Sequence, residues 1–160
     1  MLVDFNELPD SSRIWIYPSN RNFTEDEQSE LRVRIASFLE EWTAHGQSLK
    51  AGFELKYNRF IVFGLDQEVA SASGCSIDTS VRFIQELQHI YNVDLLDKMN
   101  VTFRQGQYFA HKDLKDFKKL VKSKSVAAET IVFNNLVNTK DEYLEFWEVP
   151  LKESWHARFL

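Results

Sequence analysis

The chain is poor in the residues that cross-link small secreted proteins and in the apolar runs that cross membranes. It contains one cysteine in 160 residues, so no internal disulfide can form, as is usual in a reducing compartment. No apolar stretch approaches the roughly 20 residues that span a bilayer. The first seven residues carry acids where a secretory signal needs basic residues. We therefore expect a soluble cytoplasmic protein that neither enters a membrane nor is secreted.

Positive charge is also scarce. The net charge is −5 and the isoelectric point is about 5.4, so the molecule as a whole repels nucleic-acid backbones and anionic membrane surfaces. The exception is the segment 112–124, in which six lysines stand against two aspartates. No arginine or stacking aromatic residue is interleaved with the lysines in a way typical of nucleic-acid binding, so an acidic protein partner is favoured over a nucleic acid.

What the chain does contain is enough apolar material for one folded core. Hydrophobic residues make up 44% and charged residues 27%, close to the averages of globular domains. Aromatic residues reach 14%, which indicates a core built from large rings. No linker, low-complexity tract or repeat divides the chain, so residues 1–160 are expected to form a single domain.

The order of predicted elements indicates an α+β fold. Apolar alternation predicts strands, and apolar residues at helical spacing after capping residues predict helices. The predicted strands lie at 13–17, 52–57, 60–65, 101–103, 107–110 and 130–133, and the helices at 25–45, 76–91, 114–121 and 140–147. The order is β-α-β-β-α-β followed by β-α-β-α, and its first six elements match the split βαβ order of ferredoxin-like folds.

Several segments resemble a group of small bacterial proteins that are often labelled ABC transporter ATPases. They are Trp42-Thr43-Ala44-His45-Gly46, the run from Ser73 to Ile84, the run from Phe133 to Thr139, and the ending from Ser154 to Leu160. The resemblance covers essentially the whole chain. It implies no catalytic or binding residue.

The residues contradict that ATPase label. Nucleotide binding by this class requires a glycine-rich loop that is followed by Lys and by Ser or Thr. The five glycines stand at positions 46, 52, 64, 74 and 106, and no two of them have the required spacing with a lysine after the second. The Leu-Ser-Gly-Gly-Gln signature of such ATPases is also missing.

Cys75 is the one residue whose position points to chemistry. It stands just before the predicted helix 76–91, where free backbone amides and the helix dipole stabilise a thiolate. His45, at the end of the preceding predicted helix, is the candidate base. Because unpaired cysteines are among the most buried residues, a buried structural cysteine is the default interpretation.

The same turn is a candidate for anion binding. Its amides could hold a phosphate or carboxylate with the help of neighbouring hydroxyl and guanidinium groups. The candidate ligand-binding residues are Gly74, Ser76, Asp78, Thr79 and Arg82. A phosphatase loop would need arginine six positions after the cysteine, where Val81 stands instead.

No metal or cofactor is expected. The four histidines are widely separated, and none has another ligand at metal-binding spacing. We therefore expect a cytoplasmic module that binds a small anion or a protein partner without catalysis, with a homodimer as an open alternative. The competing hypothesis is a thiol-dependent enzyme that uses Cys75 as its nucleophile.

Overall fold

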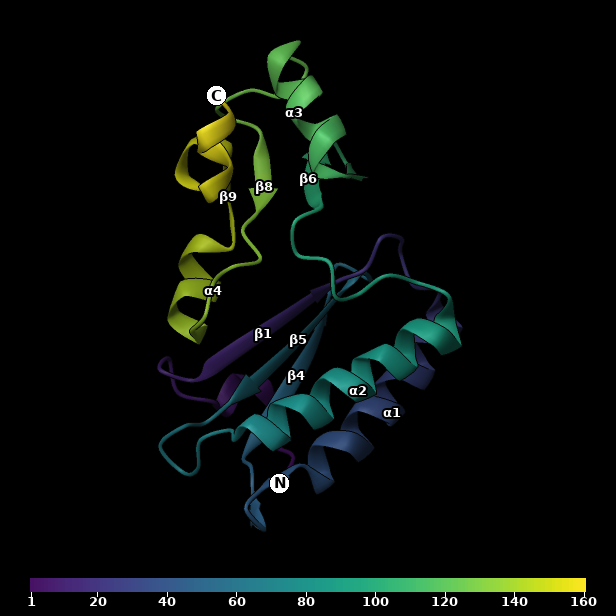
Figure 1. The fold of residues 1–160 in the computed structure, drawn as a ribbon, viewed down its shortest axis with the longest axis vertical. Helices are drawn as coiled ribbons and strands as arrows, with labels where there is room; N and C mark the ends of the chain where they lie inside the picture. Colours follow the sequence, from purple (N-terminus) through teal and green to yellow (C-terminus); the bar gives the residue numbers. More distant parts are fainter.

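A computed structural model describes all residues from 1 to 160 and confirms the α+β class. The two larger of three antiparallel sheets follow one another along the long axis of the molecule (Figure 1). The first contains β1 (Arg13–Pro18), β4 (Ala51–Lys56) and β5 (Phe60–Leu65), and it carries α1 (Glu25–Glu41) and α2 (Gly74–Tyr91). The second contains β6 (Val101–Gln105), β7 (Tyr108–Lys112), β8 (Ile131–Phe133) and β9 (Glu148–Pro150), accompanied by α3 (Leu114–Lys122) and α4 (Lys140–Phe146).

The first sheet contains three of the four strands of the expected ferredoxin-like core. Its order is β1-β5-β4 with antiparallel neighbours, so β1 and β4 are parallel and β5 lies between them. This is a split βαβ unit, with α1 as the connection between β1 and β4. The hairpin of β4 and β5 turns through Tyr57 and Asn58, which both have positive φ.

The fourth strand of the ferredoxin-like arrangement is absent from this sheet, and that part of the prediction is wrong. The strand after α2 is β6, which pairs with β7 and β8 in the second sheet. The free edge of β1 is covered by the segment before α4, because Ile14 N donates to Asn138 O at 2.8 Å. Lys140 N likewise donates to Ser12 O at 2.9 Å. A later segment thus occupies the edge that β6 would have needed.

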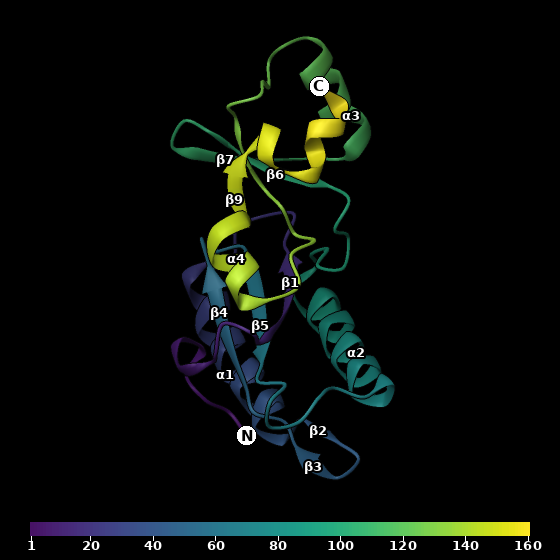
Figure 2. The same cartoon turned by 90° about the vertical axis from the view of Figure 1, so that its left-hand side faces the viewer.

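Alternation along β1 and β5 divides the core around the first sheet. Trp15 and Phe63 face α1 and α2, whereas Ile16 and Phe60 face α4 and the N-terminal segment. Both faces of β5 are therefore buried, as its unbroken apolar sequence predicts. Figures 1 and 2 show α1 and α2 together on one side of this sheet and α4 on the other.

The second sheet has its own small core. Phe103 and Val132 pack against Phe117 of α3 and against Leu151. The last residues fold back as a 3-10 helix, Trp155–Phe159, beside α3 (Figures 1 and 2). The second sheet, α3 and this C-terminal segment form what we call the second lobe, and the first sheet with α1 and α2 forms the first lobe.

Most expected elements are present, with local differences. The capping box from Thr24 to Glu27 starts α1, but α1 ends at Glu41 and a short hairpin follows, β2 (Thr43–Ala44) and β3 (Gln47–Ser48). That hairpin and β9 lacked a clear strand pattern and were not predicted. No helix has the length and apolar character needed to cross a membrane.

Candidate functional site

The turn before α2 is organised mainly by its own serines. The helix begins at Gly74 with Ser73 as the N-cap, so the predicted start at Ser76 is two residues late. Ser73 Oγ accepts from Ser76 N at 3.1 Å, and Ser76 Oγ accepts from Ser73 N at 2.7 Å. Ser76 is buried. The hydroxyl of Ser76 and one of the helix-start amides therefore serve the capping box.

Cys75 is exposed, which corrects the default expectation of a buried cysteine. It lies in the first turn of α2 and forms no hydrogen bond to His45. His45 is exposed in the β2–β3 turn, at φ 53°. The hairpin lies near the start of α2, because Trp42 Nε1 donates to Ser76 O at 2.9 Å. The two candidate catalytic residues are thus at the same end of the molecule without a direct contact.

The other candidate residues of this turn follow the surface of α2. Thr79 Oγ1 donates to Cys75 O at 2.9 Å and accepts from Arg82 Nη2 at 3.2 Å. Asp78 is exposed, and a Cβ on Gly74 would meet no atom within 4 Å. The five residues share one helical turn or its neighbour, and none of them lines any of the five main cavities.

The largest cavity lies elsewhere, between α3 and the C-terminal segment. It has a volume of about 640 Å³, within the range of small-molecule sites. We call it the α3 groove. Apolar side chains make up most of its lining, and three lysines complete it. The lining residues are Lys118, Val121, Lys122, Lys124, Val126, Ala127, Ala128, Phe159 and Leu160.

The three groove lysines lack acidic partners. Lys118 and Lys122 are one helical turn apart on α3 and stand next to Val121, which faces the core of the second lobe. Lys118 Nζ lies 5.0 Å from the centre of the Phe159 ring. The ion pairs of the molecule involve none of Lys118, Lys122 and Lys124. Their positive charge is therefore available to an anionic ligand.

A second, more polar cleft of about 320 Å³ lies where α4 meets the first sheet. Tyr143 Oη donates to Glu54 Oε2 at 2.7 Å, and Tyr57 Oη donates to Glu148 Oε1 at 2.5 Å. Burial, with help from the neighbouring carboxylates, raises the pKa of both tyrosines. Arg104 also pairs with Glu148 at 3.2 Å. These groups satisfy one another and join the two lobes.

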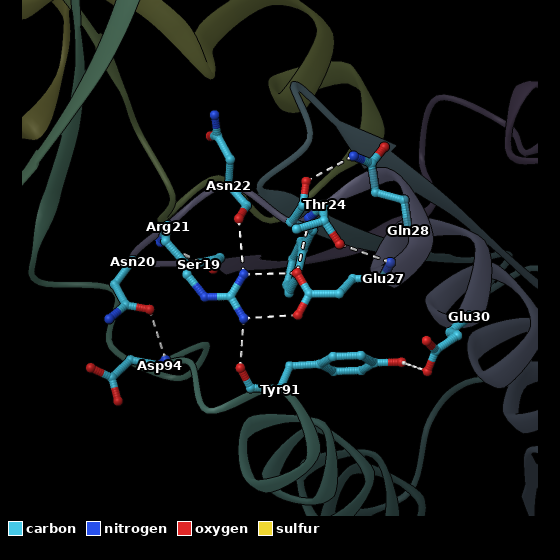
Figure 3. A network of polar contacts seen from close by, with 11 residues as sticks. Ser19, Asn20, Arg21, Asn22, Thr24, Glu27, Gln28, Glu30, Tyr91 and Asp94 are labelled. Carbon is cyan, nitrogen blue, oxygen red and sulfur yellow. Dashed lines mark hydrogen bonds and ion pairs between the residues drawn. The ribbon is translucent and has the colours of Figure 1, made fainter.

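A third polar cluster connects the start of α1 with the end of α2 (Figure 3). Arg21 donates to both carboxylate oxygens of Glu27, at 2.8 and 2.9 Å, and to Tyr91 O at 2.6 Å. The hydrogen bond from Arg21 lowers the pKa of Glu27 to about 2. Because both carboxylate oxygens of Glu27 and both terminal nitrogens of the Arg21 guanidinium have protein partners, this cluster is a structural connection.

The sequence pointed to the lysines of the α3 groove but not to its apolar part. Val121 belongs to the helix that the apolar spacing at 114–121 predicts. Phe159 and Leu160 lie more than 35 residues later, so no local pattern relates them to Val121. The polar cleft was missed completely, because Glu54 and Tyr57 belong to the β4–β5 hairpin and Tyr143 to α4, more than 80 residues later. No group of three or more His, Cys, Asp and Glu side chains is placed to hold a metal ion.

Comparison of the chain with protein-family models, with curated proteins and with solved structures gave no significant match.

Proposed function

We propose that this protein is a cytoplasmic ligand-binding or partner-binding module and that it binds at the α3 groove. The observation that carries the proposal is the combination of an apolar cavity of about 640 Å³ with three lysines that have no acidic partner. Ligand sites are typically apolar hollows with a few polar groups that orient the ligand. This arrangement favours an anion that also has an apolar part.

The surrounding charge supports the same choice. The segment 112–124 carries a surplus of four positive charges on a chain whose net charge is −5. A local positive field on an acidic protein attracts an anion to this end of the molecule and repels it elsewhere. The turn before α2 offers no comparable hollow, so the α3 groove is the better binding site.

An apolar anionic dye tests the proposal. We expect 1-anilinonaphthalene-8-sulfonate to bind the native protein with a saturable rise in fluorescence. Ala127 is exposed and lines the groove, so Ala127→Trp should fill part of the cavity and weaken dye binding at least fivefold. Ser71→Trp places the same ring on an exposed position outside the groove and is the matched control. Equal dye binding by both variants would contradict the assignment of the site.

The exposure of Cys75 favours a second candidate function, a thiol-dependent enzyme. An exposed cysteine in the first turn of an 18-residue helix can present its sulfur to a substrate near the positive end of the helix dipole. His45 would have to approach from the neighbouring hairpin to act as the base.

The alkylation rate of Cys75 against pH separates the two functions. The enzyme function requires rapid reaction with iodoacetamide at a midpoint well below about 8.5, the value of a free thiol. His45→Gln should then slow the reaction, whereas His89→Gln, at the far end of α2, should not. A midpoint at the free-thiol value, with no effect of His45→Gln, would remove this candidate.

A further inference from the structure

The α3 groove also restricts the chemistry of its ligand. Six of its nine lining side chains are apolar: Val121, Val126, Ala127, Ala128, Phe159 and Leu160. None of these six side chains donates or accepts a hydrogen bond. Whatever lies against them must itself be free of polar groups, because a buried polar group without a partner costs free energy.

An extended peptide does not meet this requirement. Each of its residues carries an N–H and a C=O that need partners, and the apolar side chains supply none. A helix satisfies its own backbone, but with its side chains it is about 10 Å wide. A hollow of about 640 Å³ could receive only some of its side chains. An alkyl chain has no polar group and meets this requirement.

The lysines specify the other end of the ligand. Lys118 and Lys122 line the groove together with the apolar residues, one helical turn apart, and neither forms an ion pair. Lys124 is a third ammonium group on the same lining. A single carboxylate between Lys118 and Lys122 would receive charge-assisted hydrogen bonds from both.

We propose that the α3 groove binds a free fatty acid, with the alkyl chain against the apolar residues and the carboxylate between Lys118 and Lys122. This inference rests on the proposed binding function and specifies its ligand. The apolar lining selects for chain length, and the lysines select for negative charge.

Calorimetric titration with dodecanoate, below its micellar concentration, tests the role of the alkyl chain of the ligand. We expect binding of one molecule per protein. Affinity should rise about three- to fourfold for each methylene between octanoate and dodecanoate, as expected for burial of a methylene group. Butyrate should not bind measurably.

The charge of the ligand is tested with dodecyltrimethylammonium, which has the same chain and the opposite charge. It should bind at least tenfold more weakly than dodecanoate. The double variant Lys118→Gln, Lys122→Gln should weaken dodecanoate binding at least tenfold. The matched control is Lys112→Gln, Lys115→Gln, which removes the same charge from exposed positions that do not line the groove. This control should change the affinity less than threefold.

Four outcomes would overturn the inference. The first is equal affinity for dodecanoate and dodecyltrimethylammonium, and the second is equal weakening of dodecanoate binding by the two double variants. The third is that the protein binds phosphatidylglycerol vesicles but not free dodecanoate. The fourth is self-association in sedimentation experiments that buries the groove. If Ala127→Trp still weakens dye binding but dodecanoate does not bind, the inference of a fatty-acid ligand fails and the proposed binding function stands. If neither binds, both proposals fail.

Discussion

Tyr143 on α4 donates a hydrogen bond from its hydroxyl to Glu54 Oε2 on β4, across 2.7 Å and 89 positions of sequence. Tyr143 is 5% exposed and packs edge-on against Phe5. This contact holds α4 against the face of the first sheet opposite to α1 and α2. The lobes are therefore joined by a partly buried polar contact as well as by apolar packing.

Removal of that hydroxyl should destabilise the protein without unfolding it. Tyr143→Phe keeps the ring but loses a hydrogen bond to a charged group, which should lower the free energy of unfolding by about 1.5–3 kcal/mol. Urea denaturation measures the change. Tyr108→Phe, at a side chain that is 77% exposed, is the control and should have almost no effect. A loss of equal size in both variants would contradict this role of Tyr143.

Lys140 should be the lysine that matters most for stability. Its ammonium group is buried and donates to the carbonyls of Phe5, Asn6 and Leu8, at 3.2, 3.3 and 2.7 Å. Lys140→Met would leave these carbonyls without their charged donor and should cost about 2–4 kcal/mol.

Lys152→Met provides the comparison for Lys140→Met. Lys152 pairs with Glu129, but the two side chains are 51% and 73% exposed, and exposed pairs contribute little to stability. Thermal and urea unfolding of the two variants measure the difference. Similar stability of both variants would mean that the N-terminal segment does not depend on the buried ammonium group.

Acid should weaken the second lobe through His156. Burial lowers the pKa of His156 to about 4, from about 6.5 in an unfolded chain. The unfolded chain therefore binds a proton first as the pH falls. Stability that is complete above pH 6.5 is lost progressively between about pH 6.5 and 4, by up to about 3 kcal/mol.

A stability profile of His156→Gln against the native protein isolates this contribution. The variant loses the packing of the ring on Phe117 and should be less stable at pH 7. Its free energy of unfolding should nevertheless fall less between pH 7 and 4.5 than that of the native protein. Parallel profiles of the two proteins would contradict the assignment to His156.

The carboxyl group of Glu27 should have a pKa far below that of an ordinary glutamate while Arg21 is present. The bidentate hydrogen bond from Arg21 lowers the pKa of the Glu27 carboxyl to about 2, from 4.5. The stability that this pair provides is present above about pH 4.5 and is lost as the pH falls through about 2. In Arg21→Gln, the pKa of Glu27 should return toward 4.5.

Carboxyl carbon NMR measures the titration of Glu27 directly. Arg82→Gln, on the outer surface of α2, removes the same charge away from the cluster and should leave the pKa of Glu27 unchanged. An unchanged value in Arg21→Gln would mean that the backbone amide of Thr24 alone stabilises the carboxylate.

Local signals in the sequence predicted most elements because their causes are local. The capping box from Thr24 to Glu27 begins α1, and Gly106 with positive φ turns the hairpin of β6 and β7. The start of α2 was misplaced because Ser73 and Ser76 both suit a cap, and only the reciprocal bonds identify Ser73 as the N-cap. No sequence pattern shows whether a single cysteine is buried. Cys75 was therefore expected in the core, as most unpaired cysteines are, but it is exposed on the surface.

By itself, the sequence determined the α+β class, the strand and helix periodicity, and the excess of lysine on α3, since each depends on residues close along the chain. The tertiary structure alone decided which sheet receives β6 and which residues complete the α3 groove. Asn138 and Lys140 cover the edge of β1, and Phe159 and Leu160 line the groove together with Val121. Such contacts join segments far apart in sequence. Their partners are selected by the packing of the whole chain, which no short pattern records.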